Sequence, residues 1–97
     1  MQNVEVVKRT LFGHKAELRK KFKVKNLGVF GSYVRGDPKV SSDVDVLVDF
    51  EEPVGLFEFT KLENYLSDLL GVKVDLVSKK ALKPHIGERI LEEVIMI

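Results

Sequence analysis

The spacing of apolar residues along the chain predicts a few short helices and strands in a regular order. Apolar side chains recur at helical spacing over residues 4–22, which predicts one helix with a basic outer face. Gly13 weakens the middle of this helix by roughly 1 kcal/mol relative to alanine. Residues 27–30 form a short apolar run that predicts a buried strand, ending abruptly at Gly31-Ser32.

Two alternating segments flank the strongest helical pattern. Residues 43–50 and 72–77 alternate between apolar and polar side chains, and this period of two predicts half-buried strands. Residues 56–70 carry an apolar stripe that includes Leu56 and Phe59. For Leu56, Phe57 and Phe59 we expect core packing, with the alternative that some of them are exposed and form a surface for a partner. A glycine follows directly, where helices commonly end.

The last part of the chain predicts a helix and a short final strand. Pro84 suits the first turn of a helix, and the apolar residues 94–97 suit an edge strand. The resulting order is helix, strand, strand, helix, strand, helix and strand. This order predicts one domain over residues 1–97, of the α/β or α+β class, with helices packed on a sheet.

The amino-acid composition excludes several kinds of functional site. A chain of 97 residues with 44% hydrophobic and 32% charged residues is typical of one globular domain. The absence of cysteine excludes disulfides, thiolate nucleophiles and cysteine zinc sites, and 2 histidines make a histidine-rich metal site a poor fit. Since no apolar run reaches the ~20 residues of a membrane span, and no signal peptide precedes the domain, we expect a cytoplasmic protein without membrane contact.

Charge is distributed unevenly. Residues 1–40 carry ten Lys/Arg and three acids, whereas residues 41–97 carry six bases and twelve acids. A basic front half favours an anionic substrate or partner. For most of these lysines the simpler interpretation is the solvated face of a helix. Direct binding of nucleic acid is not expected, because few aromatic residues are interleaved and no nucleic-acid motif is present.

Three carboxylates make up the first half of a possible active site. Asp43 and Asp45 stand at positions i and i+2 of a predicted strand, so their side chains share one face with Cα atoms ~6.5–7 Å apart. Two such charges repel unless they are solvated or share a cation. Oxygen-rich sites of this kind suit Mg²⁺ or Mn²⁺. Asp75 adds a third acid from another strand, between two apolar neighbours.

The second half is an anion pocket at the end of the first strand. Gly31 and Ser32 offer backbone N–H groups and a hydroxyl, and Arg35 adds a charged donor suited to phosphate. Ten residues separate Ser32 from Asp43, and no G-x-x-x-x-G-K-[ST] loop is present. Phosphate donors facing metal-binding carboxylates are the parts of a phosphoryl- or nucleotidyl-transfer site.

At these residues the sequence resembles the polymerase-beta-type nucleotidyltransferase superfamily, and more closely the minimal nucleotidyltransferase antitoxins that pair with HEPN-domain toxins. The resemblance runs from the Gly-Ser motif through Asp75 to the helix that contains Ile90-Leu91. It implies a small α+β fold with a mixed sheet and helices packed on it.

The resemblance also implies a role for each site residue. Gly31 and Ser32 would hold the triphosphate of ATP, and Arg35 stands at a position that is often basic. Asp75 would complete the metal site and help to deprotonate the attacking hydroxyl. The metal ligands would be Asp43, Asp45 and Asp75. Two Mg²⁺ ions ~3.5–4 Å apart, or Mn²⁺ in their place, would clamp the α-phosphate.

In this family the acceptor is a tyrosine of the HEPN toxin partner, and transfer of AMP from the nucleoside triphosphate silences the toxin. A chain of this length leaves no residues for a second domain to hold the acceptor, so we expect a partner protein or another subunit to supply that surface.

Simpler structural interpretations exist for the same residues. Asp43 and Asp45 could begin a solvated strand after a serine-rich turn, and Asp75 could be a surface acid on an edge strand. Ser32 could be only a helix N-cap. Arg35 could pair with Asp37 or with another surface acid.

Two other functions also remain open. The chain could be a non-catalytic module that neutralises its partner stoichiometrically, or a catalytic subunit whose acceptor is a small molecule or an RNA.

Overall fold

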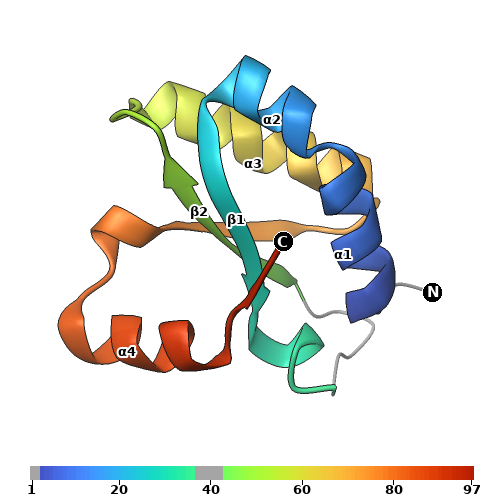
Figure 1. Ribbon diagram of the computed structural model, residues 1–97, viewed down its shortest axis with the longest axis vertical. Helices are drawn as coiled ribbons and strands as arrows, with labels where there is room; N and C mark the ends of the chain where they lie inside the picture. Colours follow the sequence, from blue (N-terminus) through green and yellow to red (C-terminus); the bar gives the residue numbers. More distant parts are fainter. Residues whose placement is uncertain (1–2, 37–42) are drawn as a thin grey trace.

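The computed structural model describes residues 3–36 and 43–97. In these residues four strands form one mixed sheet with the order β3-β2-β1-β4 (Figure 1). β1 runs antiparallel to β2 and to β4, whereas β2 and β3 are parallel. The strands are β1 Val24–Phe30, β2 Val44–Phe50, β3 Val74–Ser78 and β4 Ile95–Met96. The serine-rich turn expected before Asp43, and with it Asp37 as a possible partner of Arg35, lies outside the described residues.

Helices complete this α+β fold. The α-helices are α1 Val4–Gly13, α2 Lys15–Phe22, α3 Leu56–Leu70 and α4 Pro84–Glu93, and the short 3₁₀ helices are η1 Gly31–Tyr33 and η2 Lys79–Ala81. α1 packs against α2 and α3, while α2 packs on β1 and α3 packs on β3. α4 lies apart from the other three α-helices, beneath the sheet in Figure 1.

The single helix predicted over residues 4–22 is wrong, because the structure divides it at His14. This residue has φ −110° and ψ 6°, and its N–H donates to the carbonyls of Leu11 and Phe12. The weakness at Gly13 therefore becomes a break between α1 and α2. By contrast, the predicted helix over residues 56–70 is confirmed, and it ends at Gly71 with φ 70°.

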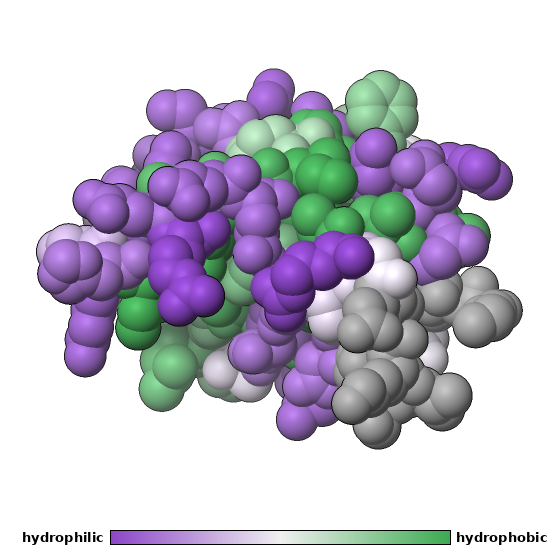
Figure 2. Space-filling view, turned by 90° about the horizontal axis from the view of Figure 1, so that it is seen from below, coloured by the Kyte–Doolittle hydropathy of each residue, from purple (hydrophilic) through white to green (hydrophobic). Residues whose placement is uncertain are grey.

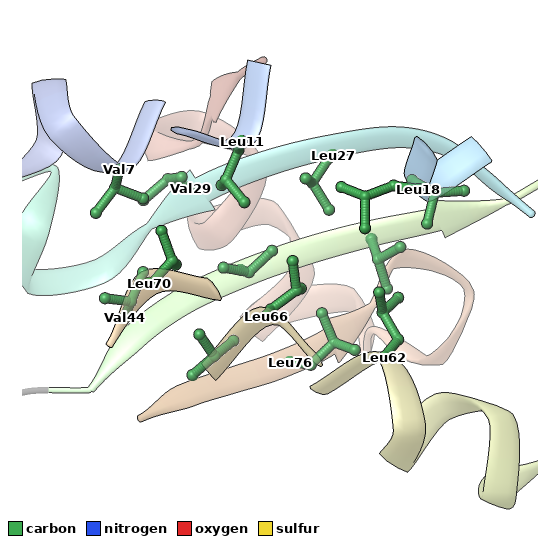
Figure 3. Close-up of a cluster of buried hydrophobic side chains, with 14 of the residues drawn as sticks. Val7, Leu11, Leu18, Leu27, Val29, Val44, Leu62, Leu66, Leu70 and Leu76 are labelled. Carbon is green, nitrogen blue, oxygen red and sulfur yellow. The ribbon is translucent and has the colours of Figure 1, made fainter. Parts of the chain in front are cut away.

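The core lies between the sheet and the helices α1, α2 and α3. Figure 3 shows side chains from these helices meeting those of the strands. The residues with no exposed surface are Val7, Leu11, Leu18, Val29, Val44, Val46, Val48, Leu62 and Leu66. Burial of these side chains is what holds β1 and β2 in the register that positions their ends.

The start of α3 departs from the expected packing. Leu56 is 80% exposed and Phe57 is 71% exposed, so core packing is wrong for these two residues and the alternative of exposure holds. The first turn of α3 carries them into solvent, and only Phe59 turns inward, 6.4 Å from the ring of Phe50. No helix in the described part of the chain is long and apolar enough to cross a membrane.

Candidate active site

The site begins where β1 ends. Antiparallel pairing of β1 with β2 sets Phe30 opposite Asp45, so the residue after Phe30 lies beside the start of β2. That residue, Gly31, has φ +80° and opens η1. Its carbonyl accepts hydrogen bonds of 3.1 Å from the N–H groups of Val34 and Arg35. The backbone therefore folds back on itself at the glycine, directly next to the first strand residues of β2.

The three predicted carboxylates lie at the start of two neighbouring strands, β2 and β3. Asp45 and Asp75 are direct partners in the parallel register of β2 and β3, so their side chains point to the same face. Asp43 immediately precedes β2, and its Oδ2 lies 3.8 Å from Nζ of Lys73. Asp43 and Asp45 are partly buried, whereas Asp75 is exposed.

The three carboxylates interact electrostatically. Burial raises the pKa of Asp45, and the neighbouring charges of Asp75 and Asp43 raise that pKa further. The guanidinium of Arg35 acts in the opposite direction, while Glu93 adds to the rise. An excess of negative charge therefore gathers beside the turn, which is the electrostatic setting that a divalent cation neutralises.

Gly31 is essential to this arrangement for a steric reason. A Cβ built on Gly31 would overlap Oδ2 of Asp45 and would lie 2.8 Å from its Cγ. The positive φ of Gly31 also disfavours any side chain there. The Asp45 carboxylate thus occupies the space that a side chain at position 31 would need.

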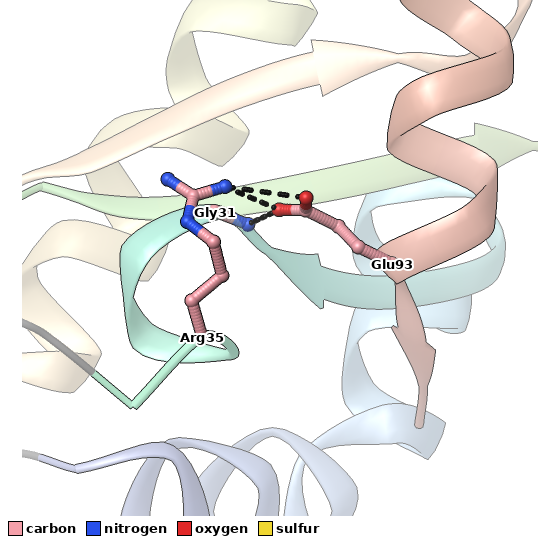
Figure 4. Close-up of polar contacts among 3 residues, drawn as sticks. All are labelled: Gly31, Arg35 and Glu93. Carbon is pink, nitrogen blue, oxygen red and sulfur yellow. Dashed lines mark hydrogen bonds and ion pairs between the residues drawn. The ribbon is translucent and has the colours of Figure 1, made fainter.

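Glu93 is a further residue of the site, and it was absent from the sequence-based prediction. Its Oε1 accepts a 2.6 Å hydrogen bond from the N–H of Gly31, and Nη1 of Arg35 lies 3.0 Å and 3.2 Å from its two carboxylate oxygens (Figure 4). Arg35 therefore pairs with Glu93. The one available signal was an acid in the last turn of a helix, where the helix dipole disfavours negative charge.

Ser32 lies inside η1 and is partly buried. The N-cap position of η1 belongs to Phe30, and no side chain caps the turn, so the alternative of Ser32 as an N-cap is wrong. The Ser32 hydroxyl therefore sits on the same turn as the Gly31 N–H and the Arg35 guanidinium. Figure 2 views this side of the molecule, where hydrophilic side chains surround smaller hydrophobic patches.

The donor set suits a hard divalent cation, because carboxylate oxygens are the ligands that Mg²⁺ prefers. Burial and two neighbouring carboxylates raise the pKa of Asp45, and a bound cation would relieve that repulsion. Among residues 3–36 and 43–97, no three acidic or histidine side chains are grouped closely enough in this conformation to hold a metal ion.

A mixed sheet with a glycine-serine turn beside strand-borne carboxylates is the arrangement that the resemblance to nucleotidyltransferases implies. In agreement, residues 13–97 match the family described as the nucleotidyltransferase domain. The chain therefore belongs to the nucleotidyltransferase domain family.

Individual relatives agree with this assignment. The chain is 52% identical over 97 residues to protein adenylyltransferase MntA of Thermococcus cleftensis, covering 100% of this chain and 98% of that protein. A solved structure assigned as a minimal nucleotidyltransferase superposes with a TM-score of 0.81 at 35% identity, covering 97% of this chain and 95% of the other.

The fold also matches one chain of a solved complex in which a tri-AMPylated HEPN toxin of Shewanella oneidensis is bound to an MNT antitoxin. This match has a TM-score of 0.68 at 17% identity and covers 93% of this chain and 70% of the other. At that level of identity the likeness concerns the fold.

Proposed function

We propose that the chain is an Mg²⁺-dependent protein adenylyltransferase that uses ATP and acts as the antitoxin of a HEPN-type toxin. The observation that carries this proposal is the pairing of Asp45 with Asp75 in register, beside the Gly31 turn. The name of the Thermococcus cleftensis relative, protein adenylyltransferase, supports the same activity. The tri-AMPylated HEPN toxin bound to a protein of this fold supports the same kind of partner.

The proposal assigns the metal to the three carboxylates and the triphosphate to the turn. Asp43, Asp45 and Asp75 would hold Mg²⁺, which when bound supplies positive charge against the carboxylates and the triphosphate. Gly31, Ser32 and Arg35 would hold the triphosphate, with Ser32 and Arg35 donating hydrogen bonds to phosphate oxygens. A toxin-antitoxin pair of the same fold has been solved with AMP-PNP, an analogue of the proposed donor.

The proposed acceptor is a hydroxyl of the partner protein. Asp75 is the exposed member of the three carboxylates, so an incoming hydroxyl can reach it. From there its carboxylate can take the proton that the hydroxyl loses as its oxygen bonds to the α-phosphorus of ATP and pyrophosphate leaves. We propose that residues 1–97 act as one domain, and that the toxin supplies the surface that holds its own tyrosine.

The direct test incubates the chain with ATP labelled on the α-phosphate, Mg²⁺ and the product of the gene adjacent to its own, which we propose to be a HEPN-type toxin. Asp43→Asn, Asp45→Asn and Asp75→Asn should each reduce transfer at least about 100-fold, because even outer partners of metal ligands contribute 10- to 100-fold. Asp49→Asn is the matched control, since Asp49 lies on β2 but away from its start. It should retain activity.

The same assay separates a catalyst from a binding module. A catalyst modifies an excess of toxin, whereas a stoichiometric inhibitor neutralises only an equal amount. Neutralisation that needs equimolar protein and survives all three Asp→Asn changes would contradict the proposed activity. Transfer of label to a small molecule or an RNA, but not to the toxin, would contradict the proposed acceptor.

A further inference from the structure

Glu93 connects two parts of the chain that are distant in sequence. It follows Gly31 by 62 residues and Arg35 by 58 residues, yet its carboxylate contacts both. One oxygen, Oε1, accepts from the Gly31 N–H and from Arg35 Nη1 at the same time. The first and fifth residues of the turn are therefore tied to the end of α4 by a single side chain (Figure 4).

The contact with Glu93 involves only Nη1 of the Arg35 guanidinium. Both close contacts to Glu93 come from Nη1, while Nη2 points away from the carboxylate in Figure 4. The Arg35 side chain is 60% exposed, against 30% for Glu93. An arginine fork can thus bind a carboxylate on one side and still present donors to a phosphate on the other.

The position of Glu93 is itself held firmly. The N–H of the next residue, Val94, donates to the carbonyl of Ile90 at 2.9 Å, and β4 then pairs with β1 at Gly28. A Cβ on Gly28 would lie 2.6 Å from Cγ2 of Val94, so the glycine allows the end of α4 to approach β1 closely. β1 is the strand that leads into Gly31, and it therefore supports both ends of the contact.

We propose that Glu93 is a positioning residue of the nucleotide site, which holds the Gly31–Arg35 turn in the conformation that receives the triphosphate. This inference rests on the proposed function. If the turn is already ordered in the free protein, binding does not have to supply the free energy that orders it. Losing the Glu93 contacts should therefore weaken nucleotide binding. Glu93 acts through Gly31 and Arg35, without touching the nucleotide.

The first experiment measures the turn in the protein without nucleotide. Amide hydrogen exchange over residues 31–35 should be faster in Glu93→Gln than in the wild type, because the charged acceptor of the Gly31 N–H and of Arg35 is lost. Glu92→Gln is the matched control: it removes the same charge from the adjacent, exposed position of α4. Equal exchange rates in the two variants would overturn the proposal.

The second experiment measures binding of AMP-PNP with Mg²⁺ to the same three proteins by calorimetry. Glu93→Gln should raise the Kd about tenfold, a size typical of outer partners of a site, and Glu92→Gln should leave it unchanged. Glu93→Asp should bind more tightly than Glu93→Gln, since it restores the charge.

The outcomes separate this inference from the proposed function. Tighter binding by Glu93→Gln would mean that Glu93 competes with phosphate for the turn, and unchanged binding would mean that its contacts do not serve the nucleotide. Either result overturns the inference while leaving the proposed function intact. A wild-type protein that binds no AMP-PNP would overturn the proposed function, and the inference with it.

Discussion

The carboxylate of Asp45 lies against the backbone of Gly31, in the space that any side chain at position 31 would fill. The two residues come from different elements, η1 and β2, and the antiparallel register of β1 with β2 brings them together. One contact thus joins the turn proposed for phosphate to the strand proposed for metal. The backbone conformation of Gly31 and the position of Asp45 are consequently interdependent.

Replacing Gly31 by alanine should therefore affect both stability and the site. The positive φ alone should cost about 1–2 kcal/mol for a residue with a Cβ. Overlap with Asp45 should add to that cost and displace the carboxylate. The measurements are the free energy of unfolding in urea and the Kd for AMP-PNP with Mg²⁺.

Gly36→Ala is the matched control for this change. Gly36 has φ +77°, but nothing lies within 4 Å of a Cβ built there. It should show the conformational cost without the displacement of Asp45. Equal losses of stability and of nucleotide binding in the two variants would argue against the Gly31–Asp45 contact as a determinant of the site.

Asp45→Asn should stabilise the fold at neutral pH in the absence of metal. The pKa of Asp45 is raised in the folded state, first by burial and then by Asp75 and Asp43, so its ionised form destabilises the fold above that raised pKa. Below the ordinary aspartate pKa of about 3.9 the group is protonated in both states, and the advantage of the variant should vanish. Urea unfolding from pH 3 to pH 7 in EDTA measures this difference.

Asp49→Asn provides the comparison for that series, because Asp49 lies on the same strand. A stabilisation by Asp45→Asn that stays constant from pH 3 to pH 7 would not come from ionisation of Asp45.

Magnesium should stabilise the wild-type protein through the same carboxylates. A ligand at ten times its Kd adds about 1.4 kcal/mol to the stability of the folded state. In a domain of this size that gain corresponds to several degrees in Tm. Thermal melts with MgCl₂ and with NaCl at equal ionic strength should differ for the wild type. They should coincide for the double variant Asp45→Asn/Asp75→Asn, and an undiminished Mg²⁺ effect there would place the cation elsewhere.

A contact away from the site links α2 to α3 and should depend on pH. The hydroxyl of Tyr65 donates a 2.7 Å hydrogen bond to Oε1 of Glu17, and this bond, together with Lys21, lowers the pKa of Glu17. A lowered carboxylate pKa adds stability above the ordinary glutamate pKa of about 4.3, and that stability is lost as pH falls through the lowered value. Tyr65→Phe should therefore be less stable than the wild type at pH 7, with a smaller deficit at pH 3.

A double-mutant cycle isolates that hydrogen bond. The ring of Phe22 lies 5.1 Å from that of Tyr65, and this ring contact persists in Tyr65→Phe. If the hydrogen bond is responsible, Tyr65→Phe should have little effect in a Glu17→Gln background at pH 7. An equal effect in both backgrounds would assign the loss to packing.

Local patterns in the sequence predicted most of the elements because each pattern depends on neighbouring residues. Spacing alone predicts the helix over residues 56–70 and the strand over residues 43–50, which correspond to α3 and β2. Spacing does not predict the break at His14, because a glycine that weakens a helix is compatible with either one helix or two. The exposure of Leu56 and Phe57 also depends on where α3 leaves the sheet, which periodicity does not determine.

By itself, the sequence determined the chemistry available to this protein: a glycine-serine turn with an arginine, two carboxylates two residues apart, and a third farther along. Only the tertiary structure decided how these groups meet. The parallel register of β2 and β3 places Asp75 beside Asp45, and the end of α4 places Glu93 in contact with the Gly31 turn. The physical reason is that sequence spacing governs which side chains share a strand or helix face, whereas contacts across 30 or 60 residues depend on how the packed core aligns those elements.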